Sequence, residues 1–162
     1  MVYIVMGVAG SGKTTVGEAL AQRLNIPFHD GDDFHPRANV EKMSAGIPLT
    51  DDDRWPWLDA LATASATWEA SGGAVLACSA LKQVYRDRLI SKNSDTKFVY
   101  LEGSRELLLK RLQDRPHHYM KPEMLTSQLA TLEPPRDALR VDISQPPEEI
   151  VNSIMNALGK KS

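Results

Sequence analysis

Short hydrophobic runs alternate along this chain with longer segments in which apolar residues recur at helical spacing. Five runs are predicted to form strands, at residues 2–6, 27–29, 74–78, 97–101 and 139–143. The first, third and fourth are almost continuously hydrophobic, as is typical of parallel strands that are buried on both faces. In the fifth run apolar and polar residues alternate, which favours an edge position or a half-exposed strand. The pattern predicts a three-layer α/β fold, a parallel sheet flanked by helices.

The longer segments are predicted to be amphipathic helices. They cover residues 14–24, 53–71, 104–113 and a last segment from about Pro147 to Gly159. The acidic residues 51–53 come just before the second helix, and Ser104 opens the third. Both features favour helix N-termini, because carboxylates and hydroxyls interact well with the unpaired N–H groups there.

Size and composition narrow the class of protein. The 162 residues fit one domain, 1–162, and the hydrophobic content of 42% is ordinary for a globular protein. A net charge of −2 gives no sign of a nucleic-acid-binding face or a membrane-binding face. A single cysteine, Cys78, excludes an internal disulfide and is expected to be a small packing residue. The apolar start, 1–6, has no basic flank, so it is interpreted as a strand and the protein as cytoplasmic.

A glycine-rich loop follows the first strand. Residues 7–14, G-V-A-G-S-G-K-T, fit the phosphate-loop pattern G-x-x-x-x-G-K-[ST] between a strand and a helix, which is the expected context. We expect Lys13 to contact the β- and γ-phosphates of a nucleotide and to be catalytic, and the Thr14 hydroxyl to bind Mg²⁺. The predicted nucleotide contacts in the loop and first helical turn are Gly7, Gly10, Ser11, Gly12, Lys13, Thr14 and Thr15.

The alternative interpretation of this loop is a strand-to-helix turn that binds no ligand. A GTPase switch is not favoured, because the chain contains neither D-x-x-G nor N-K-x-D.

Two carboxylates stand at the end of the second strand. Asp30 and Asp32 would lie beside the phosphate loop, because the carboxyl ends of parallel strands meet at one edge of a sheet. Asp30 is a candidate to hold Mg²⁺ through water, and Asp32 is a candidate catalytic residue that orients an attacking hydroxyl. An ordinary acidic turn is the alternative.

Arginines follow the fourth strand. Arg111 and Arg115 lie four residues apart on one helical face, so both side chains point toward the same region, and we expect them to bind the nucleotide phosphates. Arg115 is also expected to be catalytic, by neutralising charge on the transferring group. Prolines at 116 and 122 then break the helix, which predicts a mobile lid over about 114–124. A surface helix with solvated arginines is the alternative.

Longer motifs resemble one family. They are D-G-D-x-x-H-P-x-x-N-x-x-K-M at 30–43, P-L-x-D-D-D-R-x-P-W-L at 48–58, A-C-S-A-L-K-x-x-Y-R-D at 77–87 and S-Q-x-x-x-L-E-x-P at 127–135. Together with the phosphate loop they are similar to the gluconate kinases (gluconokinases), from residue 7 to about 142. The resemblance implies a P-loop kinase fold with five parallel strands and a lid. It also implies transfer of the ATP γ-phosphoryl group to the 6-hydroxyl of D-gluconate, and a homodimer.

A sugar acid needs cations for its carboxylate and polar groups for its hydroxyls. The candidate cations are Arg54, Lys82 and Arg86, and an arginine is favoured because its guanidinium can pair with a carboxylate through two hydrogen bonds. The candidates for the hydroxyls are Asp32, His35 and Ser79, with Trp57 as a wall of the pocket. His118, followed by Tyr119, matches a His–aromatic pair in the family's lid, either as a substrate contact or as packing. Solvated surface charges are the alternative for each cation.

Two other functions stay open from sequence. A kinase of another small acceptor such as shikimate would also use Asp30 and Asp32, but residues 78–82 replace the Gly-Gly-Gly turn expected there. A non-catalytic nucleotide-binding regulator predicts a degraded catalytic set, whereas Lys13, Thr14, Asp32 and Arg115 are all present.

Overall fold

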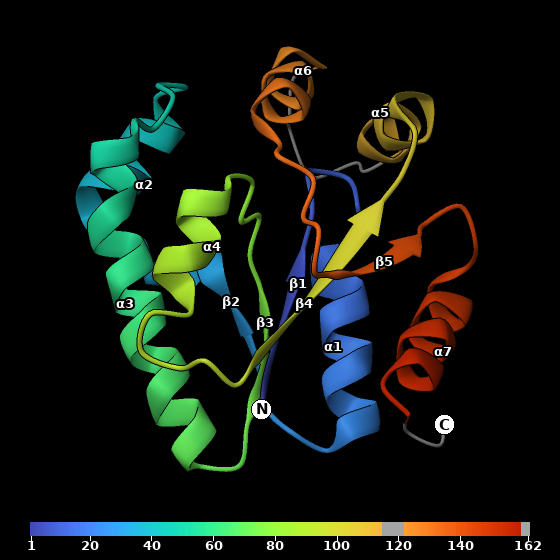
Figure 1. Ribbon diagram of the computed structural model, residues 1–162. Coiled ribbons are helices and arrows are strands. Elements are labelled where there is room, and N and C mark those ends of the chain that lie inside the picture. Colours follow the sequence, from blue (N-terminus) through green and yellow to red (C-terminus); the bar gives the residue numbers. More distant parts are fainter. Residues whose placement is uncertain (115–121, 160–162) are drawn as a thin grey trace.

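The predicted strands form one parallel sheet. The computed structural model describes residues 1–114 and 122–159 and orders the five strands β2-β3-β1-β4-β5 (Figure 1). They are β1 (Val2–Met6), β2 (Phe28–Asp30), β3 (Ala74–Ala77), β4 (Thr96–Glu102) and β5 (Leu139–Asp142). β5, the run with alternating residues, lies at an edge of the sheet as predicted.

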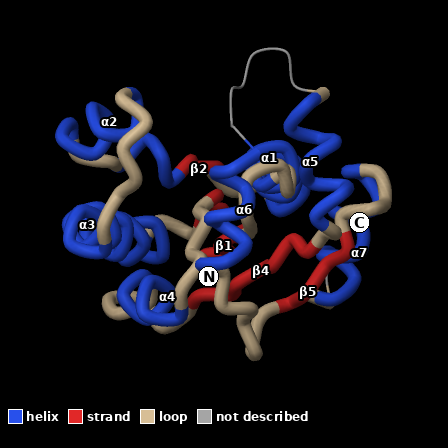
Figure 2. The backbone as a smooth tube through the Cα atoms, turned by 90° about the horizontal axis from the view of Figure 1, so that it is seen from above, coloured by secondary structure: helices blue, strands red, loops and turns tan. Residues whose placement is uncertain are grey.

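Helices pack on both faces of this sheet (Figure 2). They are α1 (Lys13–Leu24), α2 (Arg37–Ser44), α3 (Asp51–Ala70), α4 (Gln83–Leu89), α5 (Arg105–Gln113), α6 (Pro122–Thr131) and α7 (Pro147–Ala157), and a 3₁₀ turn, η1, spans Gly31–Phe34. The sequence predicted α1, α3, α5 and α7, but not η1, α2, α4 or α6. Most of the predicted lid, 114–124, lies outside the described residues, and its last residues form the start of α6.

Strand β1 lies between two hydrophobic cores. Tyr3 and Val5 pack into the core beneath α1 and α7, whereas Ile4 and Met6 pack into the core beneath α3 and α4. Because side chains alternate across a strand, a run that is apolar at every position must have both faces covered. The continuous hydrophobicity of this run is therefore explained by a three-layer fold.

Side chains cap the two helix N-termini that the sequence indicated, at Ser104 as predicted and at Thr50, which was not predicted. Thr50 accepts a hydrogen bond from the backbone N–H of Asp53, and the Asp53 side chain accepts one from the backbone N–H of Thr50, so α3 begins with a capping box. The Ser104 side chain accepts from the backbone N–H of Leu107 at the start of α5.

The connections after β1 and β3 leave the sheet toward opposite faces. β1 continues into α1 on one face, and β3 continues into α4 on the other. In open α/β sheets a crevice forms at the carboxyl ends of two strands whose connections diverge in this way. The fold therefore places a binding crevice between the phosphate loop after β1 and the loop that follows β3.

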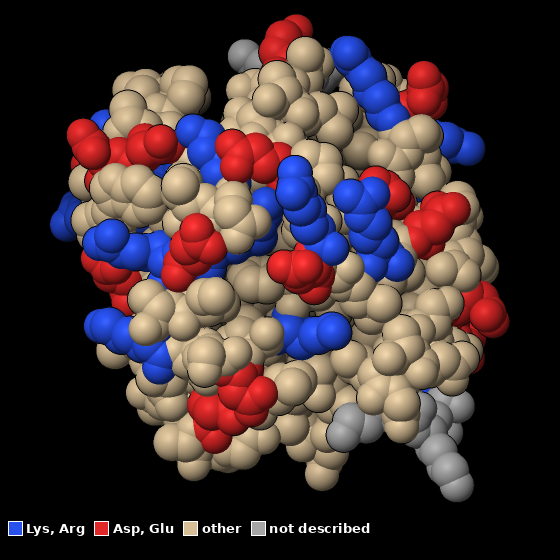
Figure 3. All heavy atoms as spheres, in the orientation of Figure 1, with Lys and Arg blue, Asp and Glu red and all other residues tan. Residues whose placement is uncertain are grey.

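The surface has a mixed charge. Basic and acidic side chains are interspersed over the face shown in Figure 3. Within 1–114 and 122–159, none of the helices has the apolar length that a bilayer crossing requires. Cys78 is buried, as expected for a packing residue, and its burial raises the pKa of its thiol to about 12.

Candidate active site

The phosphate loop forms a concave turn that ends at the first residue of α1. Gly10 and Gly12 have left-handed backbones, with φ of 84° and 90°, and a Cβ at Gly10 would lie 3.0 Å from the Leu108 carbonyl oxygen. No side chain caps the N-terminus of α1. The Ser11 hydroxyl is buried and has no hydrogen-bond partner among the described residues. A helix N-terminus and an unsatisfied hydroxyl in a glycine turn fit an anionic phosphate.

Cations reach this turn from two elements. Lys13 begins α1, and its Nζ donates to the Val8 carbonyl at 3.2 Å. Arg111 of α5 crosses the loop, because a Cβ at Gly12 would lie 3.7 Å from its Nη1, while its Nη2 donates to the Ile143 carbonyl. The structure therefore brings Arg111 to the predicted phosphate site. Arg115 and His118 lie outside the described residues.

Oxygen donors lie beside the start of α1. The Thr14 hydroxyl donates to Asp30 Oδ2 at 3.5 Å, which joins the phosphate loop to the end of β2. Within 1–114 and 122–159, no three His, Cys, Asp or Glu side chains are grouped as a metal cage. Mg²⁺ commonly takes only one or two protein oxygens, with substrate phosphates and water completing its shell. Thr14 and Asp30 fit that kind of site and not a zinc site.

Asp32 faces the open crevice. Asp30 Oδ1 accepts from the Asp32 backbone N–H at 3.0 Å and so holds the start of η1. Partial desolvation, and then the charge of Asp30, raise the pKa of the Asp32 carboxyl, whereas the charge of Lys13 lowers it. The side chain itself is 83% exposed, so a hydroxyl can reach it. A carboxylate with a raised pKa beside a phosphate site is placed to accept a proton.

His35 is a neutral member of the acceptor side. Its ring stacks on Trp57 with centroids 4.2 Å apart, and the indole Nε1 donates to the Gly31 carbonyl at 2.7 Å. Burial, and then the charge of Arg54, lower the pKa of His35 to about 4. The Asn39 amide nitrogen lies 3.2 Å from His35 Nδ1. His35 is thus placed to hydrogen-bond without carrying charge.

Two of the three predicted acceptor cations lie together. Arg54 enters from the first turns of α3 and Lys82 from the loop after β3, and both lie over the ring of Tyr85 at 5.5 Å from its centroid. Ser79 follows β3 at the same edge of the sheet and is half-buried. The charge of Arg54 lowers the pKa of His35, so Arg54 and Lys82 lie near the residues that are predicted to bind the hydroxyls.

Arg86, the third candidate cation for the carboxylate, is placed differently from Arg54 and Lys82. It is only 3% exposed, and its guanidinium donates to the carbonyls of Ala80 at 2.7 Å and Glu133 at 2.7 Å. It also donates to the Gln83 side chain and to the Leu81 carbonyl. Donors used in this way hold the loop after β3, in which Ala80 has a left-handed φ of 46°. The sequence identified Arg86 as a cation near the start of a helix but could not show that its guanidinium is buried.

A residue outside the predicted set contacts the phosphate loop. Gln128 of α6 accepts a hydrogen bond from the backbone N–H of Ala9 at 2.7 Å, across 119 residues of chain. In the sequence, the motif at 127–135 was the only signal for Gln128, and no physical role could be assigned to that motif from the sequence.

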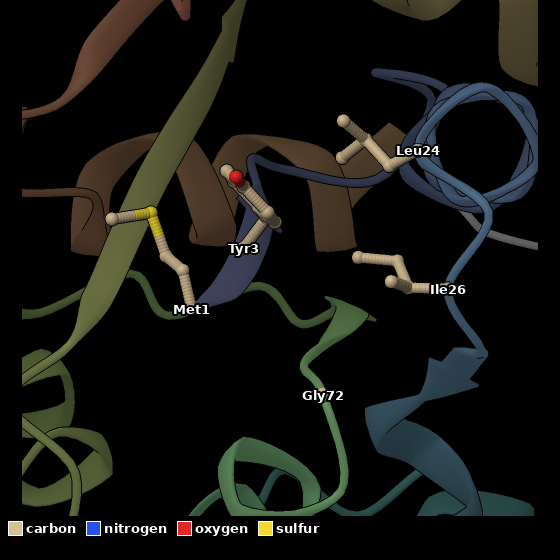
Figure 4. Close-up of a pocket in the computed structure, with 5 residues that line it drawn as sticks. All are labelled: Met1, Tyr3, Leu24, Ile26 and Gly72. Carbon is tan, nitrogen blue, oxygen red and sulfur yellow. The ribbon is translucent and has the colours of Figure 1, made fainter.

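A separate pocket lies at the opposite end of the sheet. Met1, Tyr3, Leu24, Ile26 and Gly72 line it, at the amino end of β1 and the carboxyl end of α1 (Figure 4). It contains none of the phosphate-loop or acceptor-side residues, so it is not the catalytic crevice.

Comparisons with known proteins show the family and agree with this fold. Residues 9–158 match the family model described as shikimate kinase. The thermoresistant gluconokinase of Escherichia coli K12 is 43% identical over 98% of this chain and 94% of its own length. The gluconokinase of Gluconobacter oxydans is 46% identical over 94% of this chain and 88% of its own length. A gluconokinase structure from Sinorhizobium meliloti superposes with a TM-score of 0.89 at 46% identity, covering 98% of this chain and 91% of its own.

A shikimate kinase structure from Aquifex aeolicus superposes less closely. Its TM-score is 0.61 at 22% identity, over 98% of this chain and 96% of its own, which shows a common fold alone.

Proposed function

Because this chain belongs to the shikimate-kinase-like P-loop kinases and, among them, to the gluconokinase family, we propose that it transfers the γ-phosphoryl group of ATP to the 6-hydroxyl of D-gluconate. The products are 6-phospho-D-gluconate and ADP. The observation that carries the proposal is the position of Asp32: the charge of Lys13 lowers its pKa, and its Oδ1 lies 3.9 Å from His35 Nε2.

On the nucleotide side, the loop amides and Lys13 bind the β- and γ-phosphates. Arg111, joined by Arg115, stabilises the charge that develops during transfer. Mg²⁺ held by Thr14 and Asp30 would neutralise phosphate charge. The Thr14–Asp30 contact of 3.5 Å supports this pairing, since both groups supply the hard oxygen ligands that Mg²⁺ prefers.

On the acceptor side, Asp32 orients the 6-hydroxyl and accepts its proton as the oxygen attacks the γ-phosphorus. His35 and Ser79 bind hydroxyls further along the sugar acid, and Arg54 and Lys82 bind its carboxylate. Arg86 is left out of this set, since its guanidinium holds backbone carbonyls. His118 and the lid at 114–124 stay predictions from the sequence. The family resemblance further supports a cytoplasmic homodimer.

The discriminating experiment measures ADP release with Mg²⁺-ATP across a panel of acceptors. The panel holds D-gluconate, other five- and six-carbon sugar acids, shikimate and no acceptor, with Lys13→Ala as the inactive control. We expect turnover with gluconate far above the others. Shikimate is included because the matching family model bears that name and shikimate also carries a carboxylate and hydroxyls. Turnover with shikimate but not gluconate would overturn the proposed acceptor, and no turnover with any acceptor would overturn the kinase.

A further inference from the structure

One carboxylate lies between the two acceptor cations. Asp51 accepts a hydrogen bond from the Tyr85 hydroxyl, and Lys82 Nζ lies 3.3 Å from both of its oxygens. Arg54 Nη1 lies 3.9 Å from Asp51 Oδ1, while it donates to the Leu49 carbonyl at 2.8 Å. Asp51 and the Tyr85 ring therefore contact both cations at once.

Asp51 is not needed to begin α3. The capping box is made by Thr50 and Asp53, and Asp53 also pairs with Lys42 at 2.9 Å. Asp52 supplies a further negative charge in the same first turn. The helix N-terminus is thus satisfied without Asp51, whose side chain points instead toward the acceptor cations.

The charges in this cluster depend on one another. Tyr85 foremost, with Lys82 and Arg54, lowers the pKa of Asp51, and Asp51 raises the pKa of Lys82. Asp51 and Lys82 therefore both carry their charge near neutral pH. Two cations this close would otherwise repel each other and turn toward solvent, because long cationic side chains have many rotamers. A fixed anion between them removes that tendency.

We propose that Asp51 is a positioning residue of the acceptor site, which, anchored by the Tyr85 hydroxyl, holds Arg54 and Lys82 side by side as the receptor for a single carboxylate. The inference rests on the proposed function, because it assumes an acceptor that carries a carboxylate. One internal anion for two cations leaves one positive charge, which matches a monoanionic sugar acid. Asp51 touches neither the acceptor nor the phosphates and acts through its two neighbours.

The test compares Asp51→Asn with Asp52→Asn. Both changes remove one charge from the same helical turn and keep the side-chain size, but only Asp51 contacts the cations. We expect Asp51→Asn to raise the KM for gluconate about tenfold, the scale of one lost hydrogen bond to a charged group. The KM for ATP and kcat should change less than about threefold, because the phosphate side is untouched. Asp52→Asn should leave all of these values near those of the wild type.

Tyr85→Phe is the second variant. It keeps the ring beneath both cations and removes only the hydroxyl that anchors Asp51, so we expect a smaller rise in the same KM. The double variant should be no worse than Asp51→Asn alone, because both changes remove one arrangement. Additive effects of the two substitutions would contradict the anchoring role of Tyr85.

The possible outcomes separate the two proposals. If Asp51→Asn behaves like Asp52→Asn, or lowers the KM because Asp51 competes with the acceptor, the positioning role is wrong while the kinase assignment stands. If the wild type uses another carboxylate-bearing acceptor from the panel, the same comparison is made with that acceptor. If it turns over none of the acceptors in the panel, both proposals are wrong.

Discussion

Arg86→Met tests whether Arg86 supports the fold or binds the acceptor. Methionine nearly fills the space of the arginine side chain but donates no hydrogen bonds, so the substitution removes contacts without opening a large cavity. The guanidinium is buried and donates to the carbonyls of Ala80, Leu81 and Glu133. If those contacts are its role, the loss must appear in the free energy of unfolding.

The structure sets the size of that loss. The Leu81 carbonyl keeps a partner in the variant, because it also accepts from the Glu133 backbone N–H at 2.8 Å. The carbonyls of Ala80 and Glu133 lose the Arg86 donor, but only Ala80 is buried, whereas Glu133 is exposed and its carbonyl can bind water. Because an unsatisfied buried carbonyl costs about 1–3 kcal/mol, we expect the free energy of unfolding to fall by roughly that amount. For a protein of this size this loss lowers Tm by about 2–12 °C.

The assay is thermal and urea unfolding followed by circular dichroism, with Arg88→Met as the matched control. Arg88 lies on the same helix, but it is half-exposed and pairs with Asp59 at 2.6 Å. Exposed pairs of this kind contribute little, so the control should shift Tm far less. A wild-type Tm for Arg86→Met, combined with a KM for gluconate raised tenfold or more, would refute the reasoning and restore Arg86 as a carboxylate ligand.

Further substitutions test the remaining groups. Lys13→Ala should lower kcat by about a hundredfold or more with a much smaller effect on Tm, since it removes transition-state stabilisation at the phosphate loop. An active variant would contradict the phosphate-loop assignment. Asp32→Asn should lower kcat by roughly 10²–10⁴-fold with the KM for ATP kept, and a loss of ATP binding would move Asp32 to the nucleotide side. The folded-state pKa of His35, about 4, lies below the unfolded value of 6.5, so the unfolded chain takes up this proton first. Stability should therefore fall as pH drops from about 6.5 toward 4, and urea unfolding of His35→Asn should show a smaller fall. Cys78 should react with a thiol reagent much more slowly in the native protein than in urea, because burial raises the pKa of its thiol to about 12; rapid native labelling would contradict this packing.

Elements held by hydrophobic burial could be predicted from the sequence. β1 and β3 are apolar at every position because both faces of the central sheet are covered, and α7 shows its buried stripe at Ile150, Val151 and Ile154. α2 gave no such signal. Its apolar residues Val40 and Met43 are exposed. Asn39 donates to the Asp53 carbonyl, and Lys42 pairs with the Asp53 side chain, so polar contacts with α3 hold α2 in place.

The candidate site likewise has one part that the sequence predicts and one part that it does not. The phosphate loop could be predicted because its function depends on backbone shape, and glycines at fixed spacing specify that shape directly. The three candidate cations of the acceptor site could be identified from the sequence, but it could not show which of them are buried and bound to backbone carbonyls. Arg54 and Arg86 are the same residue type near helix starts. Partners distant in the sequence distinguish them, because Arg54 lies over the Tyr85 ring whereas Arg86 donates to the Glu133 carbonyl. No local pattern encodes which carbonyl a guanidinium will meet.

The motif at 127–135 has a physical meaning that its letters did not show. Gln128 accepts from the Ala9 backbone in the phosphate loop, whereas the Glu133 backbone donates to Leu81 and accepts from Arg86 in the loop after β3. One short stretch of chain therefore contacts both loops that border the crevice. Phosphoryl transfer needs the attacking and leaving oxygens roughly in line, so the relative placement of those loops matters as much as the groups on either one. The Gln128 contact gives a physical reason for the glutamine, and the Glu133 side chain, which accepts from the Gln83 backbone N–H at 2.9 Å, gives one for the glutamate.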